Sequence, residues 1–102
     1  MKYYLYILQT LDNTLYSGIT NDVIKRYNAH LEGKGAKYTK AHKPKEIVYL
    51  DILEDKSSAL KEEYRIKQLQ RKDKLELIEK NKARTKEIYS IIEIEYLKKG
   101  KK

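Results

Sequence analysis

The 102-residue chain contains no cysteine, no phenylalanine and no tryptophan. Without cysteine there is no disulfide framework, no thiolate metal site and no cysteine nucleophile. No apolar run approaches the ~18 residues of a membrane-spanning helix, so the sequence predicts no membrane span. The apolar run at residues 3–8 is too short for a signal-peptide core and no small-residue cleavage site follows it, so we expect a cytoplasmic protein.

Several site types are also missing. The only two histidines, His30 and His42, lie twelve residues apart with no thiol nearby, which makes a zinc site improbable. The segment Gly33-Lys34-Gly35 lacks the length and the Lys-Ser/Thr ending of a phosphate-binding P-loop. No glycine fingerprint for a dinucleotide is present.

Positive charge is what the chain has in excess, with 23 Lys and Arg against 15 Asp and Glu and a formal net charge of +8. Such a charge favours a polyanionic partner, most commonly nucleic acid, although lysine-rich solubility explains it equally well. The charge is uneven, because residues 21–49 carry seven basic and three acidic residues and residues 80–102 carry eight and three. One basic stretch therefore lies in the first half and another in the C-terminal tail.

The patterning predicts a single domain of the order β-β-α-β-α-α. The expected elements are strands at residues 3–8, 15–19 and 46–53 and helices at about residues 23–31, 58–69 and 71–80. This order is typical of an α+β fold, here a small three-stranded sheet flanked by helices, with a polar, basic loop from Gly33 to Pro44. Residues 86–97 fit a helix or a strand equally well. We therefore expect a folded unit at residues 1–80 and a basic extension of uncertain structure at residues 81–102.

Glu63 occupies an unusual place on the predicted helix at residues 58–69. That helix has an apolar stripe made of Ala59, Leu60, Tyr64, Ile66 and Leu69. Glu63 falls within roughly 30° of the centre of the stripe, where a carboxylate is costly unless it is paired or binds a metal. The ordinary alternative is a glutamate at the edge of the stripe that pairs with Lys67 at i+4.

Arg26 and His30 lie four residues apart on the first predicted helix, so their side chains lie one above the other. A guanidinium group presents a planar fork that suits phosphate oxygens. The ordinary alternative is an exposed arginine near Asp22.

Tyrosines gather on the predicted hairpin. Tyr4 and Tyr6 point to one face of their strand because side chains alternate, and Tyr16 lies on the next strand. Packed against helices, these rings would simply be core. A tyrosine hydroxyl beside a cation has a pKa lowered from about 10 and can become a proton acceptor.

Taken together, these residues resemble the GIY-YIG nuclease domain. Tyr4-Leu5-Tyr6 corresponds to the first half of the motif, and Tyr16-Ser17-Gly18 to the second half ten residues later. Arg26 matches the helix arginine of the family, His30 matches a position held by Tyr or His, and Glu63 matches the metal-binding glutamate. The resemblance covers about residues 2–80 and looks most like the small stand-alone bacterial branch, in which the glycine and isoleucine replaced here by Tyr4 and Ser17 commonly differ.

The resemblance implies a phosphodiesterase with one Mg²⁺ or Mn²⁺ ion held by Glu63. It implies that Tyr16, or His30 with Tyr6 assisting, takes the proton of the attacking water and that Arg26 binds the phosphate. Gly18 would let the backbone approach the substrate closely. Further substrate contacts are expected from the lysines of the first basic stretch, namely Lys25, Lys34, Lys37 and Lys40.

We therefore expect an endonuclease that cuts DNA in repair, recombination or defence. A lone catalytic domain supplies few base-reading contacts, so cutting should be structure-directed or weakly sequence-selective. We expect a monomer or a weak dimer, with a protein partner as one source of specificity. The alternatives are a nucleic-acid-binding module of the same fold without catalysis, and a structural or partner-binding protein.

Overall fold

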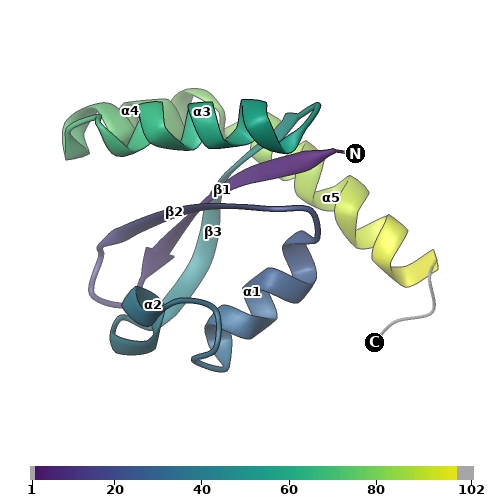
Figure 1. Ribbon diagram of the computed structural model, residues 1–102, viewed down its shortest axis with the longest axis horizontal. Helices are drawn as coiled ribbons and strands as arrows, with labels where there is room; N and C mark the ends of the chain where they lie inside the picture. The colour runs from purple at the N-terminus through teal and green to yellow at the C-terminus, as the bar shows by residue number, and fades with distance from the viewer. Residues whose placement is uncertain (1, 99–102) are drawn as a thin grey trace.

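The computed structural model describes residues 2–98, which form a three-stranded antiparallel sheet with helices on both faces (Figure 1). The strands are β1 (Tyr3–Thr10), β2 (Leu15–Thr20) and β3 (Pro44–Leu53), and they lie in the order β2-β1-β3. The helices are α1 (Val23–Leu31), α2 (Lys37–Ala41), α3 (Lys56–Lys67), α4 (Arg71–Lys80) and α5 (Lys82–Lys98). The predicted α+β class and three-stranded sheet are confirmed. No helix within residues 2–98 is long and apolar enough to cross a membrane.

Strand alternation divides the core into two layers. On one face, side chains of the sheet pack against α1 and α5; the buried members of this layer are Tyr6, Leu8, Val23, Leu50, Ile88 and Ile92. On the other face, Leu5, Ile7 and Tyr49 pack against Ile66 of α3, with α4 beside it. Figure 1 shows α3 and α4 running together across one side of the sheet while α1 lies on the other. Burying each large apolar side chain contributes roughly 1.5–3 kcal/mol, so both layers hold the sheet.

Residues 86–97, for which the pattern left helix and strand open, lie within the helix α5. The pattern was ambiguous because this helix carries isoleucines on two sides: Ile88 and Ile92 are buried, whereas Ile91 and Ile94 are exposed. Near its start, the Thr85 hydroxyl accepts a hydrogen bond of 3.1 Å from the backbone N–H of Leu50 in the edge strand β3. The helix therefore covers an edge of the sheet. The last part of the predicted basic extension, residues 99–102, lies outside the described residues.

The segment from Gly33 to Pro44 differs from the loop that we expected. It contains the five-residue helix α2, and β3 begins at Pro44, two residues earlier than predicted. The helix forms because Thr39 is buried and its hydroxyl donates to the carbonyl of Ala36 at 3.2 Å, a contact that the polar, lysine-rich sequence does not indicate. The other boundaries shift slightly: Asp55 caps α3 by accepting from the N–H of Ser58 at 2.7 Å, so α3 runs from Lys56 to Lys67.

Candidate active site

Four of the five predicted catalytic residues meet on the α1 face of the sheet. The strand register places Tyr16 opposite Leu8, so its ring lies on the same face as Tyr6. Ring centroids are 6.5 Å apart for Tyr6 and Tyr16 and 5.3 Å apart for Tyr16 and His30. Arg26 lies one helical turn before His30 on α1. The helical spacing on α1 and the side-chain alternation on β1 and β2 therefore bring these four side chains together.

A chain of hydrogen bonds orients this cluster. The Thr39 hydroxyl donates to the carbonyl of Ala36, so it accepts from Nδ1 of His30 at 2.7 Å. The Nε2 atom of neutral His30 then accepts from the Tyr6 hydroxyl at 2.8 Å. The Tyr6 oxygen in turn accepts from Nε of Arg26 at 3.4 Å. Each bond sets the direction of the next, so the network assigns the proton of His30 to Nδ1.

The electrostatics of the site follow from burial. Burial, and secondarily the charge of Arg26, lowers the pKa of His30 to about 4, so this imidazole is neutral at pH 7. Burial also raises the pKa of Tyr6, although the hydrogen bond and the charge of Arg26 act in the opposite direction. Arg26 thus lowers the pKa of Tyr6 as expected, but the expected net lowering is wrong, because desolvation of the phenolate outweighs the cation.

The buried histidine should make the free energy of unfolding depend on pH. The folded pKa of about 4 lies below the usual 6.5, so between these values the unfolded chain binds more protons. The contribution of His30 is complete above about pH 6.5 and is lost as the pH falls towards 4. We expect His30 to contribute about 2 kcal/mol less to the free energy of unfolding at pH 4.5 than at pH 7.5, allowing for solvent screening.

Urea unfolding of the wild type and of His30→Gln at the two pH values measures this contribution. Glutamine does not titrate, yet it retains an acceptor and a donor, so we expect the variant to lose most of the stability difference between pH 4.5 and pH 7.5. The same pH dependence in both proteins would contradict a buried, neutral His30.

Two glycines provide the space for these rings. A Cβ atom on Gly18 would lie 2.6 Å from Cζ of Tyr6, and one on Gly35 would lie 2.6 Å from Cγ of His30. Gly33 acts differently, because its φ of 78° ends α1, with backbone bonds from Gly33 to His30 and from Lys34 to Ala29. The sequence suggested only a helix stop here, so it missed the contact that Gly35 makes with the site.

Glu63 makes the ion pair with Lys67 that the ordinary interpretation of its sequence position predicted. Its side chain is only 17% exposed, and its carboxylate forms an ion pair of 3.2 Å with Lys67. The predicted stripe is partly wrong, because Leu60 and Tyr64 are 47% and 69% exposed. The negative charge of Glu63 is among the influences that raise the pKa of Tyr6, so its carboxylate lies within electrostatic reach of the tyrosine cluster.

The donor set at Glu63 suits some metals and not others. Within residues 2–98 there is no group of three or more His, Cys, Asp and Glu side chains that could hold an ion. Mg²⁺ is commonly held by one or two carboxylates together with waters and substrate phosphates, which matches a single glutamate. The ammonium group of Lys67 contacts the same carboxylate and so competes with a cation for it.

The predicted substrate-binding lysines are all exposed or partly exposed. Lys25 lies on α1 beside Arg26, while Lys37 and Lys40 lie on α2. Lys34 follows the end of α1 and makes a loose ion pair of 3.7 Å with Glu32. Three of these ammonium groups lie on α1 and α2, the two helices that also carry His30 and Thr39.

Comparison with known proteins agrees with this geometry. A profile of the GIY-YIG catalytic domain matches residues 2–79. The UPF0213 protein of Bacillus velezensis is 44% identical over 88 residues, which cover 86% of this chain and 89% of that protein. The UPF0213 protein of Oceanobacillus iheyensis is 50% identical over 78 residues, which cover 76% of this chain and 91% of that protein. The solution NMR structure of a UPF0213 protein from Bacillus halodurans aligns with a TM-score of 0.54 at 38% identity, covering 80% of this chain and 87% of that chain. The chain therefore belongs to the GIY-YIG family of nuclease domains, within its small UPF0213 branch.

Proposed function

We propose that this protein is a divalent-metal-dependent endonuclease that hydrolyses phosphodiester bonds in DNA. The observation that carries the proposal is the convergence of Tyr6, Tyr16, Arg26 and His30 in one cluster. Together with the carboxylate of Glu63, these side chains supply a phosphate-binding cation, proton-transfer groups and a candidate metal ligand, which can serve phosphodiester hydrolysis.

Arg26 is proposed to bind the scissile phosphate. Its pKa is raised, first by the hydrogen bond to Tyr6, so the group stays charged. The bond to Tyr6 uses the Nε atom, and Tyr16 is a second hydrogen-bonding neighbour of the guanidinium, so the remaining N–H groups of the fork are proposed to meet phosphate oxygens. Such preorganised donors stabilise the charge that develops on the phosphate during attack.

The hydrogen-bond chain offers a path for the proton of the attacking water. The water proton passes to the Tyr6 oxygen while the Tyr6 proton passes to Nε2 of His30, which already accepts that hydrogen bond at 2.8 Å. The negative charge of a bound phosphate favours the imidazolium that results. Tyr16 is less buried than either residue and is proposed to orient the water. His30, only 1% exposed, acts through Tyr6.

Glu63 is proposed to hold one Mg²⁺ or Mn²⁺ ion. When bound, the ion supplies Lewis-acid polarisation of the phosphate and stabilisation of the leaving oxygen. The single carboxylate leaves room for water and phosphate ligands, which is the usual environment of Mg²⁺.

The exposed lysines of α1, α2 and the segment between them support a proposal about how the substrate is selected. Lys25, Lys34, Lys37 and Lys40 are proposed to contact phosphates, which position a substrate without reading its sequence. We therefore propose structure-directed or weakly selective cutting in repair, recombination or defence in the cytoplasm, by a monomer or weak dimer, with a protein partner as a further source of specificity. Residues 1–80 are proposed as the catalytic unit and residues 81–102 as its basic extension.

A second candidate is a nucleic-acid-binding module that does not cut. The observation that favours it is the ion pair between Glu63 and Lys67, which already neutralises the proposed metal ligand. Binding through lysines and Arg26 alone would be strongly salt-dependent and independent of divalent ions.

Removal of metal tests the leading proposal. Supercoiled, branched and single-stranded DNA are incubated with the protein in Mg²⁺ or Mn²⁺, and in parallel with excess EDTA. We expect cleavage of at least one substrate with a divalent ion and none with EDTA, because the phosphate then lacks its Lewis acid. Salt-dependent DNA retention with no turnover on any substrate in either ion would support the binding module instead.

A further inference from the structure

A ladder of aromatic rings leads from the candidate active site to the surface. The Tyr38 ring of α2 is stacked on Tyr16 with centroids 5.8 Å apart and an interplanar angle of 18°. It is also stacked on His42, with centroids 4.3 Å apart and an angle of 21°. Tyr16 therefore belongs both to the catalytic cluster and to a stack of near-parallel rings.

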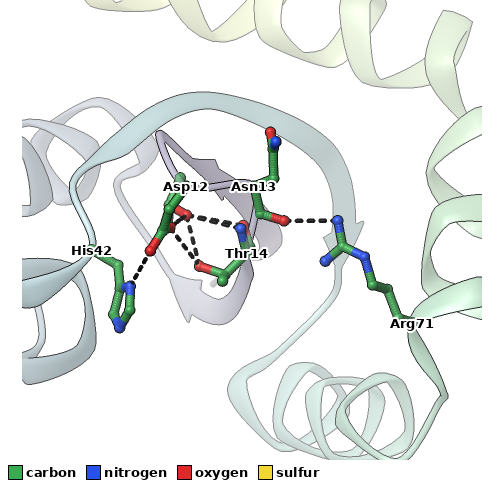
Figure 2. A network of polar contacts seen from close by, with 6 residues as sticks. Asp12, Asn13, Thr14, His42 and Arg71 are labelled. Carbon is green, nitrogen blue, oxygen red and sulfur yellow. Dashed lines mark hydrogen bonds and ion pairs between the residues drawn. The ribbon is translucent and has the colours of Figure 1, made fainter.

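The outer ring of this stack is held in place. Nδ1 of His42 lies 2.7 Å from a carboxylate oxygen of Asp12 in the β1–β2 turn, as Figure 2 shows. The other carboxylate oxygen accepts from the hydroxyls of Thr10 and Thr14. Hydrogen bonds, first from Thr10 and then from His42, lower the pKa of Asp12 to about 2, so it stays ionised at any physiological pH. The stack is thus preorganised, which reduces the entropy lost when a ligand binds.

The stack is accessible, and two lysines lie on the same helix as Tyr38. Tyr38 is 37% exposed and the His42 side chain is 34% exposed. Lys37 and Lys40 flank Tyr38 on α2, and α2 contains no acidic residue. Fixed, exposed aromatic rings among lysines are the arrangement that binds single-stranded nucleic acid, because bases stack on the rings and phosphates contact the cations. A base inside a duplex has both faces covered by its neighbours and cannot stack in this way.

We propose that the Tyr16–Tyr38–His42 stack receives an unpaired nucleobase of DNA next to the phosphate held at Arg26, so that the substrate presents a single-stranded or extruded nucleotide at the cut. This rests on the proposed function of the catalytic cluster. It adds a binding subsite made by α2, and it gives a structural reason for preferring branched or single-stranded DNA over intact duplex.

Fluorescence anisotropy of a labelled single-stranded DNA, measured in EDTA at low salt, tests the stack without requiring cleavage. Tyr38 is stacked between Tyr16 and His42, so a base would add to the outer ring, that of His42. We expect His42→Leu to raise the Kd at least about fivefold, since stacking on one aromatic side chain is typically worth that much or more. Tyr38→Phe keeps the ring and should stay within about twofold of wild type. Tyr64→Leu is the matched control, because Tyr64 is an exposed tyrosine on α3, away from the stack. An equal fall in DNA affinity in the leucine variant of the stack and in Tyr64→Leu would overturn the proposal.

Oligonucleotides with one abasic position, moved along the strand, locate the base that stacks. We expect wild type to lose at least about fivefold in affinity at one position, and His42→Leu to lose no more there than at any other position. Tyr38→Leu, which removes the ring that supports His42, should reduce the same positional effect, and a circular dichroism spectrum like that of wild type confirms that each variant folds. If the positional effect is the same in wild type and His42→Leu, the stack does not hold a base.

The outcomes also separate this inference from the proposed function. If no divalent ion supports cleavage but the positional effect depends on His42, the stack proposal holds and the endonuclease proposal fails. If wild type cleaves DNA but the positional effect is missing, the stack proposal alone is overturned.

Discussion

Glu63→Gln is expected to reduce divalent-dependent cleavage at least about a hundredfold while leaving DNA binding within about threefold of wild type. Glutamine keeps the size of the side chain but removes the charge that a hard cation requires. The fold should tolerate the change, because an ion pair with the half-exposed Lys67 contributes at most about 1 kcal/mol. Cleavage rates and anisotropy on the same DNA measure the two effects separately.

Glu62→Gln is the matched control. Glu62 precedes Glu63 on the same helix and has a similarly half-buried side chain, 28% exposed, but its carboxylate is bonded to Arg65 by two contacts of 2.8 Å. We expect this variant to cleave at the wild-type rate. If Glu63→Gln cleaves as well as Glu62→Gln, then Glu63 does not hold the metal and the proposed mechanism is wrong.

Gly35→Ala is expected to destabilise the fold by about 2–3 kcal/mol. The added Cβ would lie 2.6 Å from Cγ and 2.8 Å from Cε1 of His30, a ring that is only 1% exposed. The ring cannot move freely, since both of its nitrogens are hydrogen-bonded to Tyr6 and Thr39. Gly35 itself has no positive φ, so the cost is steric and not a backbone effect. Urea unfolding at pH 7.5 measures the change.

A double-mutant cycle isolates this contact. In a His30→Ala background the ring is gone, so adding Gly35→Ala should cost less than about 0.5 kcal/mol. Gly33→Asn is the control in the same loop, because Asn tolerates the φ of 78° and the nearest atom, Cγ of Lys40, is 3.8 Å from an added Cβ. An equal cost of Gly35→Ala with and without the histidine ring would contradict a direct contact between Gly35 and His30.

Much of the fold was predictable because its signals are local. The hairpin follows from two β-favouring runs around a turn in which Asn13 adopts a φ of 65°. The helix α1 follows from apolar spacing after the cap Asp22, whose side chain accepts from the N–H of Lys25 at 3.1 Å. The family was predictable for the same reason, since its tyrosines, arginine and glutamate recur at fixed spacings on these elements, and the profile match to residues 2–79 confirms it.

Other features were not predictable, because they depend on contacts between distant parts of the chain. α2 has no strong periodicity and is held by the buried Thr39, which binds a histidine nine residues earlier. The inward side of α3 is set by where the sheet lies, and this leaves Leu60 and Tyr64 exposed in spite of their large apolar side chains. α5 has apolar residues on two sides, so only packing decides which side is buried.

The sequence by itself determined the succession of strands and of most helices along the chain. It also determined the family and the identity of the residues proposed for catalysis. These follow from the sequence because periodicity, turn chemistry and spacing are local properties of the chain. Only the tertiary structure decided the protonation states of Tyr6 and His30 and which aromatic rings gather beside them. Desolvation makes His30 neutral and raises the pKa of Tyr6, and the amount of water removed from a group depends on everything packed around it. The same holds for the ring stack, in which Asp12, Tyr16, Tyr38 and His42 meet only after the chain has folded.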